Sequence, residues 1–367
     1  MTVHHTKEYS TASLPIARRA LLSAAGQAIA LGIASALHLP SQAAKPVPLL
    51  KLEKSKITLA ANGKGSFANL PLLLAEQLGY FANEGLELET EDMAGAARVQ
   101  QSVFSGAADV ASGTFEHILT LASKSLPAQE FVLQARAPQI AFGVSTRNMP
   151  GFKQLGELRG KRVGISAPGM PTHVMAQRVL QRAGVLPAEV SFVGVGTAAG
   201  ALAALRSGQI DALSNIDPVI TALELKAEVK IVADARTLSG TLAVFDGPMP
   251  SSCLYASSEF ISKHPQTIQA ITNAMVRALK WLQTAGPRDL MRAVPEQYLL
   301  GDRALYLAAY ERVRDGISTD GLLSPESARN AYKVMAQFEP MAGPVPIDVG
   351  KTYTNVYAQN AKKRFSA

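Results

Sequence analysis

Short stretches of glycine, serine and threonine occur where a predicted strand gives way to a predicted helix. A helix N-terminus has unpaired backbone N–H groups and carries about half a positive charge, so it can bind an anion with few side chains. Glycine lets the backbone approach a ligand, and a serine or threonine hydroxyl can add a donor. The candidate ligand-binding residues at these predicted helix starts are Ser66, Phe67, Gly95, Ala96, Ser166, Gly169, Thr172 and His173. A further helix N-terminus is expected at residues 197–198.

Arg136 follows a predicted strand at residues 130–134. A guanidinium at the end of such a strand could hold a carboxylate or a sulfonate by two parallel hydrogen bonds. The alternative for Arg136 is a surface ion pair. Thus the residue types favour a small anionic ligand, with Arg136 as its charged partner.

Four further candidates follow equivalent strands in the two halves of the chain. Thr114 and Phe115 follow a strand in the first half, and Asn215 and Asp217 follow the corresponding strand in the second. Phe115 could form an apolar wall, although a phenylalanine is also a common core residue. Asp217 does not suit a purely anionic ligand. It indicates an inter-lobe hydrogen-bond acceptor, a hinge residue, or a ligand that also has a donor or a positive end.

Reactive groups are scarce. Cys253 is the single cysteine and lies in an apolar run, which predicts a core residue rather than a nucleophile. The histidines show no metal-ligand spacing, and the loop at 63–66 lacks the full phosphate-loop pattern. We therefore expect no catalytic residue, no metal and no cofactor, and the protein is not expected to be an enzyme.

The elements that position these residues occur twice. Ser105-Gly106 leads to Asp109, and Ser207-Gly208 leads to Asp211, so both matches have an offset of 102 residues. Strand-like and helical patterns alternate around both copies, which predicts two similar α/β lobes with a ligand between them. We interpret the two aspartates as caps of backbone N–H groups, because repetition in both halves argues for a structural role.

The fold class expected is α/β, with two parallel-sheet lobes joined by two crossover segments. The first lobe should comprise residues 52–145 and 253–340, where the last part is helical, and the second lobe residues 146–252. Hinges are expected at 141–146 and 247–254, and residues 341–367 should form a C-terminal tail.

Residues 1–43 have the pattern of an export signal. Arg18-Arg19 precedes an apolar stretch at 20–39, which ends in small residues before Ala43. We expect cleavage after Ala43 rather than a membrane anchor, and a periplasmic protein. Both the twin-arginine route and the general secretory route remain open.

Composition is consistent with a folded two-domain protein. The chain has 367 residues, 47% hydrophobic and 18% charged, with a formal net charge of +7. Charges of both signs are interspersed, so we expect no continuous basic surface that would bind nucleic acid. We expect a monomer with a small-molecule ligand.

Four segments together carry a family resemblance: 71–86 (PLLLAEQLGYFANEGL), 105–110 (SGAADV), 155–165 (LGELRGKRVGI) and 205–212 (LRSGQIDA). They resemble the periplasmic solute-binding proteins of ABC importers of the nitrate, taurine and aliphatic-sulfonate type. The resemblance covers about residues 57–218 in detail. It implies a type II periplasmic-binding-protein fold that closes on a small molecule. It also implies delivery to an ABC permease and its ATPase at the inner membrane, with no chemistry on the ligand.

Other functions on the same fold stay open. The pyrimidine-forming thiamine-precursor synthases also resemble these segments, but those enzymes carry a cysteine-rich motif that a chain with one cysteine lacks. A binding protein for a thiamine-precursor pyrimidine or another heterocycle is a second alternative. A sensor component that presents its closed form to a receptor is a third.

Overall fold

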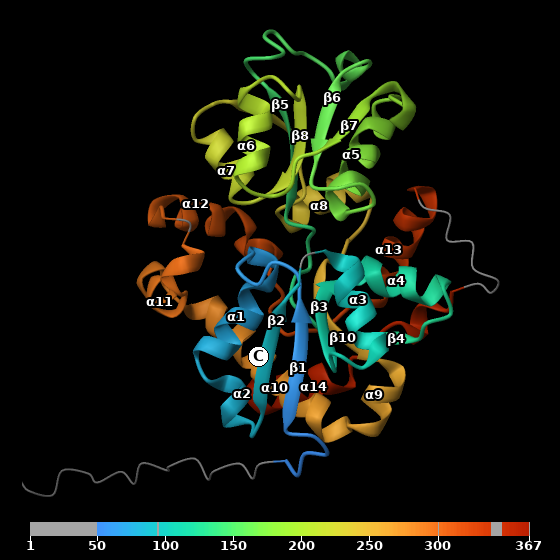
Figure 1. The fold of residues 1–367 in the computed structure, drawn as a ribbon, viewed down its shortest axis with the longest axis vertical. Coiled ribbons are helices and arrows are strands. Elements are labelled where there is room, and N and C mark those ends of the chain that lie inside the picture. Colours follow the sequence, from blue (N-terminus) through green and yellow to red (C-terminus); the bar gives the residue numbers. More distant parts are fainter. Residues whose placement is uncertain (1–49, 94, 300, 339–346, 367) are drawn as a thin grey trace, which may run out of the picture. The chain divides into compact units, whose positions relative to one another are not determined.

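The computed structural model describes residues 50–93, 95–299, 301–338 and 347–366, in which the chain forms two lobes, each built on a five-stranded sheet (Figure 1). The predicted export signal at residues 1–43 lies outside this described part. None of the helices in the described part has the length and apolar character needed to cross a membrane.

The first sheet has the strand order β2-β1-β3-β10-β4. β1 pairs in parallel with β2 and β3, whereas β10 runs antiparallel to its neighbours β3 and β4. Its strands are β1 (Lys56–Ala61), β2 (Glu87–Asp92), β3 (Val110–Thr114), β4 (Ala128–Leu133) and β10 (Ser252–Ser257).

The second sheet repeats this arrangement with the order β7-β6-β8-β5-β9. β6 pairs in parallel with β7 and β8, and β5 runs antiparallel to β8 and β9. Its strands are β5 (Ile140–Ser145), β6 (Arg162–Ile165), β7 (Ser191–Gly194), β8 (Ala212–Ile216) and β9 (Val229–Asp234). The predicted two-lobed α/β architecture is confirmed, but each sheet is mixed rather than parallel, because it includes one strand that runs against the others.

The crossing between the lobes lies earlier in the chain than we predicted. β5 belongs to the second sheet, so residues 140–145 are not part of the first lobe and the outgoing crossing spans 134–139. The returning crossing spans 246–251, between α8 (Leu238–Phe245) and β10. All six residues of β5 are buried. An apolar run of this kind could pack in the core of either lobe. Only its pairing with β8 and β9 shows that it belongs to the second lobe.

Helices follow most strands and cover the sheets. In the first half these are η1 (Phe67–Asn69), α1 (Leu70–Gln77), α2 (Tyr80–Asn83), α3 (Ala96–Ser105) and α4 (Phe115–Ser123). In the second half they are η2 (Leu155–Leu158), α5 (Pro171–Arg182), η3 (Pro187–Glu189), α6 (Ala199–Arg206), α7 (Val219–Glu224) and α8. The C-terminal helices are α9 (Ser258–Lys263), α10 (Pro265–Thr284), α11 (Pro287–Ala293), η4 (Glu296–Tyr298), α12 (Arg303–Val313), η5 (Arg314–Gly316), α13 (Pro325–Phe338), η6 (Val349–Lys351) and α14 (Val356–Phe365).

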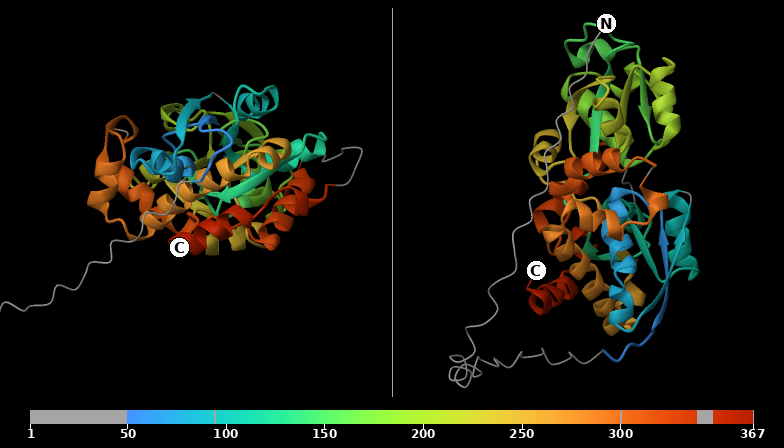
Figure 2. Two further views of the ribbon diagram at one scale, coloured as in Figure 1. Left: turned by 90° about the horizontal axis from the view of Figure 1, so that it is seen from below. Right: turned by 90° about the vertical axis from the view of Figure 1, so that its left-hand side faces the viewer.

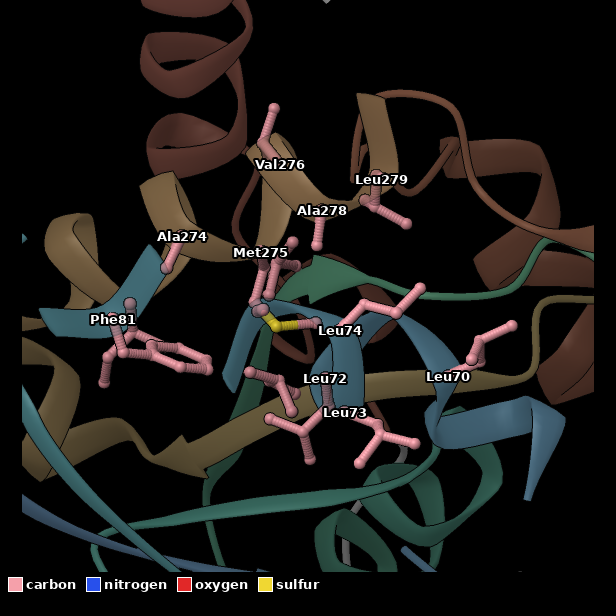
Figure 3. Packing of buried hydrophobic residues seen from close by; sticks show 14 of the residues in the cluster. Leu70, Leu72, Leu73, Leu74, Phe81, Ala274, Met275, Val276, Ala278 and Leu279 are labelled. Atoms are coloured by element: carbon pink, nitrogen blue, oxygen red, sulfur yellow. The ribbon is translucent and has the colours of Figure 1, made fainter. Parts of the chain in front are cut away.

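The core of the first lobe forms around α1, whose first six residues are all buried. A helix that is apolar on every side must be enclosed, and α1 packs between the first sheet and α10. Figure 3 shows Leu72, Leu73 and Leu74 of α1 close to Met275 of α10.

The predicted C-terminal tail contains a docked helix. α14 packs on α10 on one side of the first sheet (Figure 2), whereas α13 packs against α4. The Arg277 guanidinium of α10 lies 4.1 Å from the ring centroid of Tyr80 and 5.7 Å from that of Phe365. Arg364 also donates to the buried carboxylate of Glu84 at 2.8 Å. α14 is therefore part of the first lobe.

The two repeated aspartates have the structural role that we predicted. Asp109 accepts a hydrogen bond from the backbone N–H of Thr58 at 3.1 Å, and Asp211 accepts one from the backbone N–H of Arg162 at 2.9 Å. The Asp109 carboxylate therefore ties β1 to the turn before β3, and the Asp211 carboxylate ties β6 to the turn before β8.

A group of titratable side chains lies on the α4 side of the first sheet. Glu130 of β4 is fully buried, and neither carboxylate oxygen has a hydrogen-bond partner in the described part of the chain. Tyr255 lies beside it across the ladder, and the single cysteine, Cys253, lies on the same strand, β10. Burial raises the pKa of Glu130 well above its ordinary 4.5. Burial also lowers the pKa of His117, on α4, from 6.5 to about 4.

These shifts predict how stability depends on pH. The folded protein keeps the Glu130 proton that the unfolded chain releases above pH 4.5, so this group lowers stability as the pH rises. His117 has the opposite effect: it makes the folded protein more stable as the pH rises. This effect is confined to pH values below 6.5, the ordinary pKa of the histidine in the unfolded chain. Above pH 7, for as long as the folded protein keeps this proton, we therefore expect Glu130 to reduce the free energy of unfolding by about 1.4 kcal/mol per pH unit. Glu130→Gln should flatten this slope in urea titrations. Equal slopes in the two proteins would show that Glu130 is ionised in the fold.

Candidate functional site

The two crossings join the carboxyl edges of the two sheets. The outgoing crossing leads from Leu133, at the end of β4, to Ile140, which pairs with Ile216 at the end of β8. The returning crossing leads to Ser252, which pairs with Thr114 at the end of β3. The carboxyl ends of parallel strands share one edge of a sheet, and this edge is where ligands bind in open α/β folds. Most of the predicted site residues lie along these two edges.

In the first lobe, Ser66 and Phe67 lie in the loop after β1. Ser66 precedes η1, and its side chain makes no cap hydrogen bond. Phe67 is buried, with its ring centroid 4.8 Å from that of Tyr306 on α12, so it packs into the core of this lobe. A Cβ on Gly65 would lie 2.3 Å from the Tyr298 ring, which explains why glycine is required in this loop.

Gly95 and Ala96 begin α3, after β2. Gly95 has a φ of +90° and donates its N–H to the Asn62 side chain at 3.3 Å. The Asp92 carboxylate accepts from the N–H groups of Gly63 and Lys64, at 2.8 and 3.1 Å. The loops after β1 and β2 are thus bonded to each other.

Thr114 and Phe115 stand at the end of β3. The Thr114 hydroxyl is buried and has no hydrogen-bond partner among the residues described, and the same holds for the hydroxyl of Ser252. Phe115 is fully buried in the core. Of this pair, therefore, only Thr114 offers a polar group.

In the second lobe, Ser166, Gly169, Thr172 and His173 form one connected turn at the start of α5. The Thr172 hydroxyl accepts from the Ser166 N–H at 3.0 Å and lies 2.6 Å from the Ser166 hydroxyl. His173 Nδ1 accepts from the Gly169 N–H at 3.1 Å, which requires the neutral ring with its proton on Nε2. Partial burial lowers the pKa of His173 from 6.5, consistent with this neutral form. The His173 ring packs edge-on against Phe192.

The helices at these edges share an electrostatic property. η1, α3, α5 and α6 have no side-chain cap and no acidic residue in the first turn. By contrast, α8 is capped by Thr237, and α4 has Glu116 in its first turn. At the predicted helix N-termini, the positive end of the helix dipole is therefore not neutralised by a carboxylate in the first turn of the same helix.

Asn215 and Asp217 are held within the second lobe. Asn215 is fully buried and donates to the Gly196 carbonyl at 2.9 Å. Asp217 accepts from the Thr221 N–H at 2.8 Å and from Arg236 Nη1 at 3.3 Å. Asp217 thus forms a buried ion pair within its own lobe.

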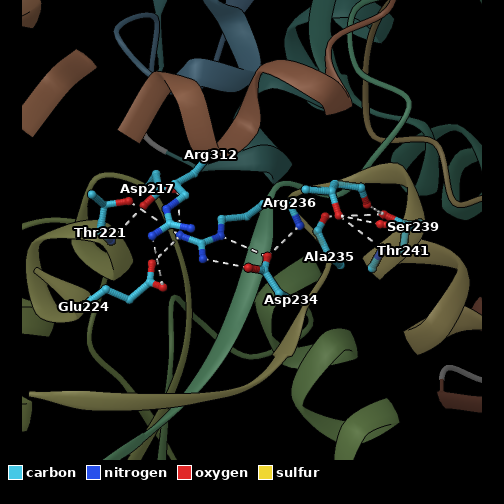
Figure 4. A network of polar contacts seen from close by, with 11 residues as sticks. Asp217, Thr221, Glu224, Asp234, Ala235, Arg236, Ser239, Thr241 and Arg312 are labelled. Carbon is cyan, nitrogen blue, oxygen red and sulfur yellow. Dashed lines mark hydrogen bonds and ion pairs between the residues drawn. The ribbon is translucent and has the colours of Figure 1, made fainter. Parts of the chain in front are cut away.

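Arg236 is the centre of this network (Figure 4). Its side chain is fully buried and bonds to Asp234 at 2.7 Å and to Glu224 at 2.8 Å, as well as to Asp217. Burial lowers the pKa of Arg236, but the bonds to the carboxylates of Asp234 and Glu224 outweigh it and raise the pKa overall, so the guanidinium stays charged. Burial raises the pKa of Asp217, and the charge of Arg236 opposes that rise. Glu224 also lies 3.9 Å from Arg312 of α12.

Arg136 lies apart from the other candidates. Its Nε and Nη2 donate to the carbonyls of Ile317 and Asp315, each at 3.3 Å. It lines a pocket with residues of α10, α12 and η5, and none of the other predicted site residues lines that pocket.

Two polar groupings were not predicted. One is a buried row in which Gln134 donates to Ser112 at 2.8 Å and Ser112 donates to Asn69 at 2.6 Å. Gln134 and Ser112 lie at the ends of predicted strands, so their position was the available signal, whereas Asn69 follows a turn and gave none. The other is Arg236, which follows β9 just as Arg136 follows β4. Among the residues described, no cluster of three His, Cys, Asp or Glu side chains is placed to hold a metal ion.

A family model described as "NMT1/THI5 like" matches residues 66–287. The chain belongs to the NMT1/THI5-like family. The matched range runs from the loop after β1 to the start of α11, and it includes every strand of the two sheets except β1.

Solved structures support this assignment. A protein of Bordetella bronchiseptica RB50 is 45% identical, with a TM-score of 0.80, covering 87% of this chain and 100% of that one. A putative periplasmic sulfonate-binding protein, SsuA, of Methylobacillus flagellatus KT is 18% identical, with a TM-score of 0.66, covering 85% of this chain and 94% of that one. The resemblance to periplasmic ABC solute-binding proteins is therefore confirmed at the level of the fold.

One curated relative is named as a synthase and not as a binding protein. The 4-amino-5-hydroxymethyl-2-methylpyrimidine phosphate synthase of Schizosaccharomyces pombe is 24% identical over 232 residues. The match covers 61% of this chain and 64% of the relative, less than two thirds of its length.

The Arg236 network gives a stability prediction for this NMT1/THI5-like chain. Arg236→Met should reduce the free energy of unfolding by about 3–5 kcal/mol, because it leaves the Asp217 carboxylate buried without its cation. Arg236→Met combined with Asp217→Asn should recover part of this loss. Arg303→Met is the control, because the pair of Arg303 and Glu296 is exposed and should contribute about 1 kcal/mol or less. Urea titrations measure all three, and a loss below 1 kcal/mol in the single variant would contradict a stabilising role.

Proposed function

We propose that this protein is the periplasmic substrate-binding component of an ABC importer. It captures a small organic anion, a sulfonate or a carboxylate, between its lobes and delivers it to a permease. The fold is that of periplasmic ABC substrate-binding proteins, and the name of SsuA supports an importer role. The pattern at residues 1–43 supports export to the periplasm.

The observation that carries the anion proposal is the state of the helix starts at the carboxyl edges. η1, α3, α5 and α6 present backbone N–H groups without a side-chain cap and without an acidic residue in the first turn. Hydroxyls near both edges supplement these donors. Thr114 and Ser252 are buried without a partner in the described part of the chain, and Ser166 is only partly buried. A bound anion would satisfy donors of both lobes and so stabilise the closed form.

A pyrimidine ligand is the second candidate, because the S. pombe relative is named for a pyrimidine phosphate. Chemistry on the ligand is not part of the proposal. Cys253 is fully buried in β10, and burial raises the pKa of its thiol well above 9.0. This thiol is poorly suited to act as a nucleophile.

A thermal-shift screen tests the ligand class. A ligand at 100 times its Kd should stabilise the fold by about 2.7 kcal/mol, which raises the melting temperature measurably. The panel should contain alkyl and aromatic sulfonates, carboxylates, nitrate and pyrimidines. Stabilisation by sulfonates or carboxylates is the expected result. If only neutral or cationic heterocycles stabilise the protein, the anion proposal is wrong.

Ser166→Ala then tests the site at α5. The variant removes a hydroxyl, while Thr172 can still accept from the backbone N–H of residue 166. We expect about tenfold weaker binding of the best anion by calorimetry, since one hydrogen bond to a charged group is lost. The melting temperature without ligand should fall only slightly, because the variant loses one hydrogen bond, to the Thr172 hydroxyl. Ser191→Ala, at an exposed position at the start of β7, is the matched control. Unchanged affinity in Ser166→Ala would remove this turn from the site.

A further inference from the structure

The second sheet has a further edge, opposite to its carboxyl edge, where β6, β7, β8 and β9 begin and β5 ends. The connections along this edge are residues 146–161, 183–190, 207–211 and 225–228. We call these connections, with the strand and helix residues that adjoin them, the distal edge. None of the predicted ligand-binding residues lies in these connections, so the distal edge is separate from the site proposed above.

Hydrogen bonds join the four connections to one another. Three side chains of the connection at 146–161 donate to backbone carbonyls of the other three connections. These bonds are Thr146 to Ala227 at 2.8 Å, Asn148 to Ile210 at 2.8 Å and Arg159 to Gly184 at 2.7 Å. The distal edge is therefore one continuous surface.

The distal edge has exposed basic side chains without acidic partners. Within the described residues, none of these side chains forms an ion pair: Arg147, Lys153, Lys161, Lys226 and Lys230. Arg147 donates to a backbone carbonyl, which does not neutralise its charge. The five cations therefore face solvent with their charge available to a partner.

The carboxylates of the same surface are already bound. Three of them form ion pairs with other arginines: Glu189 with Arg159, Asp211 with Arg162 and Glu228 with Arg206. Glu157 is the remaining acidic residue of the connections, and its carboxylate accepts from the backbone N–H groups of Lys153 and Gln154. The distal edge therefore has an excess of positive charge.

Two leucines are exposed on this surface. Leu225 and Leu186 are the most exposed large hydrophobic side chains of the described part, at 64% and 62%. Leu225 precedes Lys226, and Leu186 lies in the connection to which Arg159 donates. Exposed leucines beside basic side chains suit the surface of a bilayer, where hydrocarbon adjoins anionic headgroups.

The corresponding edge of the first sheet has a different charge balance. Three lysines there have carboxylate partners: Lys54 with Asp109, Lys56 with Glu87 and Lys263 with Glu259. The two sheets have the same arrangement of strands, so the fold does not by itself account for the unpaired cations of the distal edge.

We propose that the distal edge binds an anionic membrane surface. Each lysine or arginine that comes near such a surface adds about fivefold to the affinity, and the leucines enter the interface beside them. Leu186 precedes β7 and Leu225 precedes β9, the two outer strands of the sheet, so the cations of the connection at 146–161 lie between the leucines. A broad, flat target such as a bilayer can contact the whole of this surface at once.

The proposal goes beyond ligand capture and does not depend on the identity of the ligand. The distal edge and the carboxyl edge are opposite ends of the same sheet. A protein held to a bilayer by the distal edge therefore keeps the carboxyl edge of the second lobe away from the lipid.

Sedimentation with lipid vesicles tests the proposal. The chain used should begin after Ala43, because the apolar stretch at 20–39 would bind vesicles by itself. At low salt, vesicles of equal parts phosphatidylethanolamine and phosphatidylglycerol should bind it at least about tenfold more tightly than vesicles of phosphatidylcholine. This preference should decrease as salt is added, because the ions screen the attraction.

A pair of lysine substitutions locates the surface. Lys153→Gln combined with Lys226→Gln should weaken binding to the anionic vesicles about tenfold or more. Lys124→Gln combined with Lys363→Gln is the matched control. Both control lysines are exposed, belong to the first lobe and form no ion pair with a described residue, and the change in net charge is the same. The control should weaken binding about twofold or less.

The leucines are tested separately. Leu186→Ser combined with Leu225→Ser should weaken binding to the anionic vesicles about fivefold or more, while the dependence on salt stays that of the wild type. All the substituted side chains are exposed, so the melting temperatures should stay close to that of the wild type. If the leucine variant does not fold, the two lysine variants decide the proposal.

Two results would overturn the membrane surface. The first is equal binding to anionic and phosphatidylcholine vesicles at low salt, which would leave an acidic protein as the partner of the distal edge. The second is an equal loss of binding in the two lysine variants, which would show an effect of net charge alone. Calorimetry with the best anion should give the same affinity in the distal-edge variants and the wild type, so either result would leave the proposed function intact.

Discussion

Each sheet is completed by one strand that runs against the others and that the chain inserts next to a crossing between the lobes. β10 lies between β3 and β4, and β5 lies between β8 and β9. Without these two strands, β4 and β9 would have no partner in their sheets. Because the inserted strands are buried and paired on both sides, they cannot shift without breaking a ladder. Movement between the lobes is therefore confined to the short segments at 134–139 and 246–251.

The position of the inserted strands also determines where the polar side chains of the two lobes lie. Both crossings start or end at a carboxyl edge, so the loops that follow the parallel strands of both sheets lie next to the segments that can move. In the first lobe, the row of Asn69, Ser112 and Gln134 holds these loops. In the second lobe, Arg236 does so by binding three carboxylates. A rigid set of donors beside a flexible joint suits a protein that closes on a ligand.

The internal repeat was enough to predict much of the fold. Equal spacing around Asp109 and Asp211 indicated two similar units, and the sheets have the same strand order with the aspartates in equivalent bonds. The lobe to which β5 belongs was not predictable, because a fully buried run has no exposed face to orient it. The docking of α14 depends on Arg277, Tyr80 and Phe365, which are far apart in the sequence.

Side-chain direction was the least predictable property of the candidate site. Thr114 and Phe115 are adjacent, yet one offers a buried hydroxyl and the other packs into the core. Arg136 and Arg236 follow equivalent strands, β4 and β9, but only Arg236 is surrounded by carboxylates. Position after a strand places a residue at an edge, whereas its partners come from distant segments that the pattern does not reveal.

This difference between the two arginines bears on how the joint works. Arg236 has its full complement of anionic partners within its own lobe, so its charge has little left to offer a ligand. Arg136 is bonded only to neutral carbonyls of a segment that also contacts the second lobe through Asp315. The joint is therefore held at this point by hydrogen bonds from the outgoing crossing and from α8 to η5 and the residue after it, and not by an ion pair of Arg136.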